Sequence, residues 1–143
     1  MSNAAPAATG VQMGAVSLEG FRCRVVHGPS GTQIQTEAPR DNGGTGASCS
    51  PTDLVGAALA TCMLTTMALV ATREGVPWGE ASASVEKRMT PPPRRIGELV
   101  VEIRMPKELP EDRRAQFEEV ARTCPVARSL HSDTKVTESF VYP

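Results

Sequence analysis

An uncharged stretch of 19 residues, from Leu54 to Thr72, constrains the fold of this chain more than any other feature. Its length is close to that of a segment that spans a bilayer. The stretch is diluted by a glycine and several threonines, and no aromatic belt or one-sided cluster of Lys and Arg flanks it. We therefore expect a buried central helix of a soluble domain without a membrane partner. A membrane-associated protein is the minor alternative.

The start of this helix is marked by Ser50-Pro51-Thr52-Asp53. Ser50 is a favourable cap, Pro51 suits the first helical position, and Asp53 meets the positive end of the helix dipole. We expect the helix to run to about Glu74 and to end at Gly75. Because it is apolar nearly all round, it is predicted to pack against elements on several sides.

Alternating apolar and polar residues predict strands both before and after this helix in the sequence. The clearest alternation places Leu99, Val101, Ile103 and Met105 on one face. Shorter helices are expected after Pro110 and Pro125. The expected strands cover residues 21–26, 32–37, 81–87, 96–105 and 136–142, and the third and fourth would form an antiparallel hairpin. Strands and helices in separate blocks are typical of the α+β class.

Length and composition narrow the function classes. The chain has 143 residues, enough for one domain, which we assign to residues 17–143 after a flexible tail at 1–16. The net charge is −1 with mixed signs, and aromatic residues make up 3%, so no nucleic-acid partner is expected. The N-terminus lacks the pattern of a secretory signal, so we expect a cytoplasmic protein.

Four cysteines carry the chemistry that this sequence offers: Cys23, Cys49, Cys62 and Cys124. They form no Cys-x-x-Cys pair, and the two histidines stand at no zinc-ligand spacing, so no metal is expected. A stable disulfide scaffold is also disfavoured in a chain without an export signal. For any single free cysteine, a buried structural role is the ordinary interpretation.

Local reasoning separates the two cysteines that lie in predicted helices. Cys62 lies about three turns past the start of its helix, beyond the reach of the helix dipole. Cys124 directly precedes Pro125 and is predicted at an N-cap, where backbone N–H groups favour a thiolate. This reasoning predicts Cys124 as the more acidic thiol.

Two motifs resemble a known family. The segment Ser50-Pro51-Thr52-Asp53-Leu54-Val55-Gly56-Ala57-Ala58-Leu59-Ala60-Thr61-Cys62, followed about sixty residues later by Cys124-Pro125-Val126, resembles the OsmC/Ohr family of osmotically inducible and organic hydroperoxide resistance proteins. The resemblance implies an intertwined homodimer of α+β fold, with antiparallel sheets packed on a long central helix. It also implies two active sites at the dimer interface.

The resemblance assigns roles to the two cysteines. It implies that Cys62 attacks a hydroperoxide and becomes a sulfenic acid, and that Cys124 resolves it as a disulfide. Organic hydroperoxides are the expected substrates, with H₂O₂ as a further candidate. An external dithiol, such as a lipoyl group, would reduce the disulfide, and no cofactor is implied.

The charged residues of the family site match less well. The family glutamate lies ten residues before the attacking cysteine, which is Thr52 here, and Asp53 is the nearest acid. Ten residues of helix span about 15 Å, so an acid in this region could reach Cys62 only on a partner chain. The supporting arginine is assigned to Arg22 or Arg24, with Arg40 as a weaker candidate.

These departures favour the broader OsmC-like branch. They also leave an alternative function open, a non-enzymatic homodimer that responds to redox state or binds a small ligand.

Overall fold

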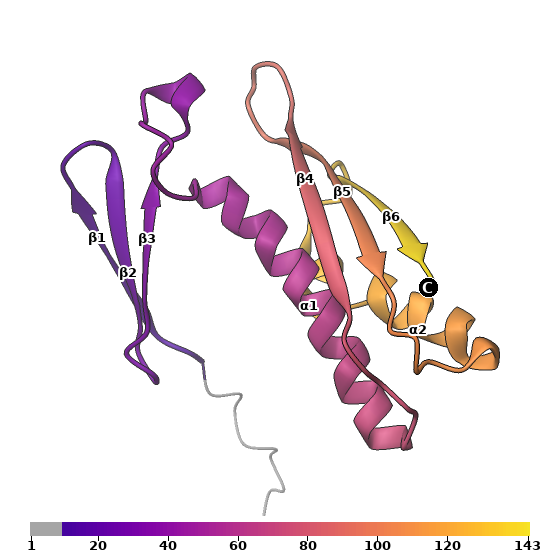
Figure 1. Ribbon diagram of the computed structural model, residues 1–143. Coiled ribbons are helices and arrows are strands. Elements are labelled where there is room, and N and C mark those ends of the chain that lie inside the picture. The colour runs from indigo at the N-terminus through magenta and orange to yellow at the C-terminus, as the bar shows by residue number, and fades with distance from the viewer. Residues whose placement is uncertain (1–9) are drawn as a thin grey trace, which may run out of the picture. The chain divides into compact units, whose positions relative to one another are not determined.

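The computed structural model describes residues 10–143 and divides into two compact units, which we describe separately: unit 1, up to Pro51, and unit 2, from Thr52 to Pro143 (Figure 1). Each unit contains a three-stranded sheet. Both sheets and the helices of unit 2 make the protein α+β, which confirms the predicted fold class. Most of the tail expected at 1–16 lies outside the described residues.

Unit 1 is an antiparallel sheet of β1 (Met13–Leu18), β2 (Arg22–His27) and β3 (Gln33–Glu37), in that order. Residues 13–16 are predicted to belong to the tail but lie in β1, where Gly14 pairs with Val26 and Val16 with Arg24. The sequence does not predict this strand because its surroundings are rich in Ala, Gly and Ser. β1 is held by its backbone hydrogen bonds to β2 and not by its own β-propensity.

A buried carboxylate holds the loop that follows β3. Glu37 is 2% exposed, and its Oε1 accepts hydrogen bonds from the backbone N–H of Thr45 at 2.7 Å and from the Thr45 hydroxyl at 2.8 Å. These two donors, and the charge of nearby Arg22, hold the pKa of the Glu37 carboxyl below its ordinary value. Gly44 is required in this loop because a Cβ there would collide with the backbone oxygen of Ala38.

Unit 2 packs the long helix α1 (Pro51–Glu74) against a sheet of β4 (Ser82–Met89), β5 (Ile96–Arg104) and β6 (Lys135–Val141). The bounds of α1 agree with the prediction. β4 and β5 form the expected antiparallel hairpin, but β6 pairs with β5 in parallel. The parallel pairing requires a crossover, which consists of η2 (Glu111–Arg113), α2 (Arg114–Arg122) and α3 (Pro125–Ser129).

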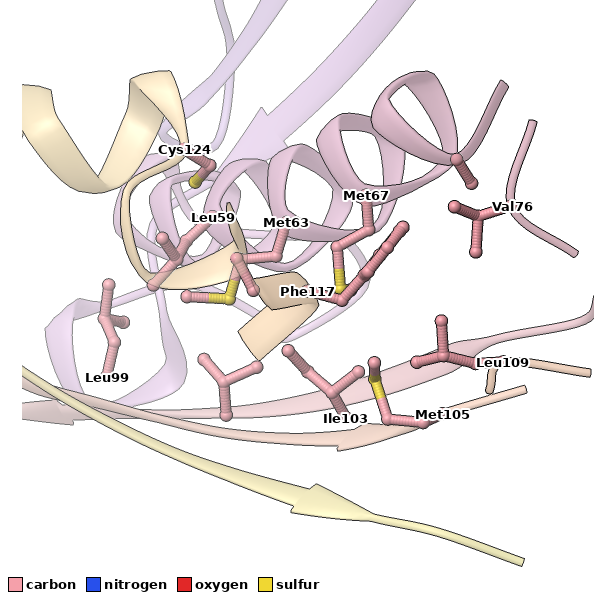
Figure 2. Packing of buried hydrophobic residues seen from close by; sticks show 13 residues of the cluster. Leu59, Met63, Met67, Val76, Leu99, Ile103, Met105, Leu109, Phe117 and Cys124 are labelled. Atoms are coloured by element: carbon pink, nitrogen blue, oxygen red, sulfur yellow. The ribbon is translucent and has the colours of Figure 1, made fainter. Parts of the chain in front are cut away.

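The core of unit 2 lies between α1, the inner face of the sheet and α2. Leu59, Met63 and Met67 point from α1 toward the strands, and each is fully buried (Figure 2). The predicted face of β5 meets them, with Leu99, Val101 and Ile103 at 0% exposure and Met105 at 4%. Phe117 of α2 completes the core, and its ring stacks on Trp78 with the centroids 5.3 Å apart.

The opposite face of α1 is exposed, so the prediction of packed elements on several sides is wrong for this chain alone. The exposed residues in the middle of the helix are Ala57, Ala58, Thr61, Thr65 and Leu69. By length and hydropathy α1 would also pass as a membrane span, but only one such helix is found in the described residues, and core helices pass the same test. The face of α1 that carries Leu59, Met63 and Met67 is buried, as in a core helix.

We expect Phe117→Ala to lower the free energy of unfolding by about 3–5 kcal/mol, because it empties a fully buried ring site. Equilibrium unfolding in urea measures the change. Glu111→Ala is the control, since that side chain is 87% exposed and should change stability by less than about 0.5 kcal/mol. Similar losses for both variants would contradict the position of Phe117 in the core.

Candidate active site

Cys124 lies at the N-cap of α3, as the sequence predicted. Its backbone is extended, with φ −62° and ψ 156°, and Pro125 opens the helix behind it. Its side chain is 0% exposed and belongs to the hydrophobic core of unit 2, beside α1 in Figure 2. Cys124 is therefore both a helix cap by backbone geometry and a core residue by burial.

Cys62 lies on α1 at the edge of the same core. It is half-buried, and it packs against the core cluster that contains Cys124. Its Sγ lies 3.9 Å from the hydroxyl oxygen of Thr66, one helical turn further along. All four cysteines are free thiols, but Cys23 is in the sheet of unit 1 and Cys49 is exposed before α1.

Burial sets the acidity of Cys124. Removal from water raises the pKa of the Cys124 thiol, and the adjacent Cys62 side chain raises it further. The backbone N–H groups of Ala127 and Val126 act in the opposite direction but do not prevail. The prediction that the helix terminus makes Cys124 an acidic thiol is therefore wrong, because it took no account of burial. The same interaction shows that the structure brings Cys62 and Cys124 together.

Asp53, the predicted acid, is bound within its own unit. Lys87 of β4 places its Nζ 2.7 Å from Asp53 Oδ1 and donates a hydrogen bond of 2.8 Å to the Thr52 hydroxyl. The Lys87 side chain is 15% exposed, whereas that of Asp53 is 45% exposed. No sequence motif identifies Lys87. The two-residue spacing does place Lys87 on the same face of β4 as Val85, and this is the less exposed face of the strand.

Metal ligands do not gather anywhere in the described part of the chain. No group of three or more His, Cys, Asp or Glu side chains among residues 10–143 is arranged to hold a metal ion. A hollow in unit 2 is lined by Glu80, Ser82, Arg104 and Lys107, with four neighbouring residues, and contains neither cysteine. The candidate site is built on the two neighbouring thiols, Cys62 and Cys124.

Comparisons with known proteins identify the family of this chain. A model of the OsmC-like protein family matches residues 44–139. A crystal structure of a Psychrobacter arcticus protein, named for osmotic stress induction and a detoxification response, is 33% identical over 96% of this chain and 99% of its own, with a TM-score of 0.83. The chain belongs to the OsmC-like family.

Two more distant structures share the fold. An organic hydroperoxide resistance protein OsmC from Legionella pneumophila is 20% identical over 94% of this chain and 98% of its own, with a TM-score of 0.73. An OsmC-like protein from Mycoplasma pneumoniae is 21% identical over 94% of this chain and 97% of its own, with a TM-score of 0.72. A search of curated proteins found no match.

The arginine candidates of this OsmC-like chain all lie in unit 1. Arg22 and Arg24 are exposed on one face of the sheet, opposite Leu18 and Val16 of β1. Arg22 donates from Nε to the Glu19 carbonyl oxygen at 3.0 Å, and Arg40 donates to the Thr45 carbonyl oxygen at the same distance. The role of any of them beside Cys62 stays a prediction.

We expect iodoacetamide to label Cys124 more slowly than the other three cysteines of the folded protein at pH 8. Its sulfur is fully buried and burial raises its pKa, whereas Cys49 is exposed. Peptide mapping by mass spectrometry after timed quenching gives the four rates. In denaturant the four rates should converge, and labelling of folded Cys124 as fast as Cys49 would contradict its burial.

Proposed function

We propose that this OsmC-like protein is a thiol peroxidase that reduces organic hydroperoxides to alcohols, with H₂O₂ as a second substrate. The observation that carries the proposal is the pairing of a half-exposed thiol, Cys62, with a fully buried one, Cys124, against a single core. The name of the Legionella neighbour supports the substrate class.

The first step takes place at Cys62, the accessible member of the pair. Its thiolate attacks the distal oxygen of ROOH, the O–O bond breaks, and the alkoxide takes up a proton and leaves as ROH. The sulfur is oxidised to sulfenic acid while the peroxide is reduced. The raised pKa of Cys124 suits this order, because Cys124 stays protonated while Cys62 reacts.

The second step uses Cys124. Its sulfur attacks the Cys62 sulfenic sulfur, the S–O bond breaks, and the departing hydroxide combines with the Cys124 proton to form water. The product is a Cys62–Cys124 disulfide. Two electrons from an external dithiol of free or lipoyl type then restore both thiols, and no resident cofactor takes part.

We further propose that the protein works as a homodimer, because one chain leaves apolar faces uncovered. In residues 10–51 the buried side chains are the polar Thr36, Glu37 and Ser50. The exposed large apolar residues of unit 1 are Val11, Met13, Val16, Leu18, Phe21 and Ile34. A three-stranded sheet needs a covered apolar face for stability, and the exposed face of α1 has the same need. A second copy would cover both.

A cation is also needed to keep Cys62 ionised, since the helix dipole does not reach it. Arg22 and Arg24 are the proposed sources, supplied by the partner subunit, with Asp53 as the acid near the start of α1. Within its own chain Asp53 is paired with Lys87, so an arginine of the partner subunit would share this carboxylate with a lysine.

We expect one equivalent of cumene hydroperoxide to consume two thiols per chain and to form a Cys62–Cys124 disulfide. Thiol titration and intact mass after a single turnover measure this, with H₂O₂ in a parallel series. Cys62→Ser should lose the reaction completely. Cys124→Ser should still react once but stop at the sulfenic acid.

Cys49→Ser is the matched control, because it removes an exposed thiol outside the pair and should leave the reaction unchanged. If the folded wild-type protein keeps both thiols in excess organic peroxide, the peroxidase proposal is wrong. The non-enzymatic homodimer would then be the better description.

Sedimentation velocity tests the homodimer. We expect twice the chain mass at micromolar concentration, and dissociation when Ile34→Glu places a charge on the exposed sheet of unit 1. Ser139→Glu, on an exposed position of β6, is the control and should stay dimeric. A wild-type monomer that is folded and stable at this concentration would refute the proposal.

A further inference from the structure

Three threonines of α1 bond back to the preceding turn of the helix. Thr61 donates to the Ala57 carbonyl oxygen at 2.8 Å, Thr66 to that of Cys62 at 2.7 Å, and Thr72 to that of Ala68 at 3.0 Å. Such back-bonds slightly destabilise a helix and do not strengthen it. Thr66 differs from the other two because its hydroxyl oxygen also lies 3.9 Å from a sulfur, that of Cys62.

The hydroxyl of Thr66 has one hydrogen and two lone pairs. With its hydrogen directed at the Cys62 carbonyl oxygen, it can offer only a lone pair to the Cys62 sulfur. This orientation accepts the S–H of a neutral thiol. It would be unfavourable beside a thiolate, which is an acceptor and has no hydrogen to share.

Rotation of the hydroxyl would reverse the direction of this contact. The Cys62 carbonyl oxygen is inside a continuous helix, so the backbone N–H of Thr66 remains its helical partner when the hydroxyl turns away. The hydroxyl hydrogen can then point at a negatively charged sulfur. Hydrogen bonds to an ionised acceptor are about twice as strong as neutral ones, and the half-buried position limits competition from water.

We propose that Thr66 is a positioning residue for Cys62: its hydroxyl oxygen accepts a hydrogen bond from the thiol in the resting state, and the hydroxyl turns to donate a hydrogen bond to the thiolate. The inference deepens the proposed function, since it assumes that the ionised form of Cys62 is the reactive one. It gives this thiol a donor from its own helix, separate from any cation that a partner subunit supplies.

The test is the pH profile of the alkylation rate of Cys62, followed by peptide mapping with iodoacetamide. Thr66→Val keeps the branched shape and removes the hydroxyl. We expect it to move the profile to higher pH and to slow alkylation at pH 7 by at least about threefold, because a donor to the charged form is lost. Thr66→Ser restores the hydroxyl and should restore the wild-type profile.

Thr72→Val is the matched control, because it removes the same kind of back-bond from an exposed turn of the same helix. Its profile should coincide with that of the wild-type protein. Thr66→Ala provides a second variant without the hydroxyl, and circular dichroism establishes that each variant is folded. A Thr66→Val or Thr66→Ala protein that is folded and has the wild-type profile would overturn the proposal, as would an equal displacement in Thr72→Val.

Failure of this inference can be told apart from failure of the proposed function. Alkylation requires no peroxide and no reductant, so the profile reports on Thr66 even if the protein does not turn over. If the Thr66 variants displace the profile while the wild-type thiols resist peroxide, the role of Thr66 stands and the peroxidase proposal is wrong. If the profile is unchanged while the Cys62–Cys124 disulfide forms fully, the peroxidase proposal stands and the role of Thr66 is wrong.

Discussion

The burial of one face of α1 against the sheet of unit 2 is the interaction on which the site depends. Leu59, Met63 and Met67 fix the rotation of the helix, because each is fully buried against β5 or α2. Successive residues of a helix differ by about 100° in direction. With Met63 pointing into the core, Cys62 must lie at the edge of the buried face, where a sulfur is partly accessible and still touches the core. The partial exposure of Cys62 is thus a consequence of how its helix neighbours Leu59, Met63 and Met67 pack.

The same core decides the chemistry of Cys124, in competition with the helix terminus. A helix dipole contributes about 0.3–1 kcal/mol at an exposed site, and α3 has only five residues to generate one. Full burial can move the pKa of an ionisable group by as much as about 3–5 units, which is several times larger. Burial therefore prevails, and the thiol at a helix N-cap is the one that keeps its proton. Burial inside the core thus raises the pKa of the Cys124 thiol in spite of its place at a helix terminus.

The features that could be predicted from the sequence are those with local causes. Pro51 and Gly75 delimit α1, alternation identifies the inner face of β5, and Pro125 places Cys124 at its N-cap, all as observed. The misses have non-local causes. The parallel pairing of β6 with β5 depends on the crossover through α2, and β1 depends on its partner strand. The raised pKa of Cys124 depends on neighbours from α1, which its own segment cannot reveal.

The contact between Asp53 and Lys87 bears on where the charge at this site originates. Lys87 points toward α1 from the inner face of an edge strand, and there it meets the first turn of the helix, where the dipole disfavours a cation. Asp53 and the Thr52 hydroxyl compensate for this, so the pair anchors the start of α1 to β4. An arginine approaching Asp53 would meet a carboxylate already neutralised by a lysine and would gain less from it. In unit 1, by contrast, Glu37 is buried and directly opposite Arg22 in the β2–β3 ladder, and the charge of Arg22 helps to lower the pKa of its carboxyl.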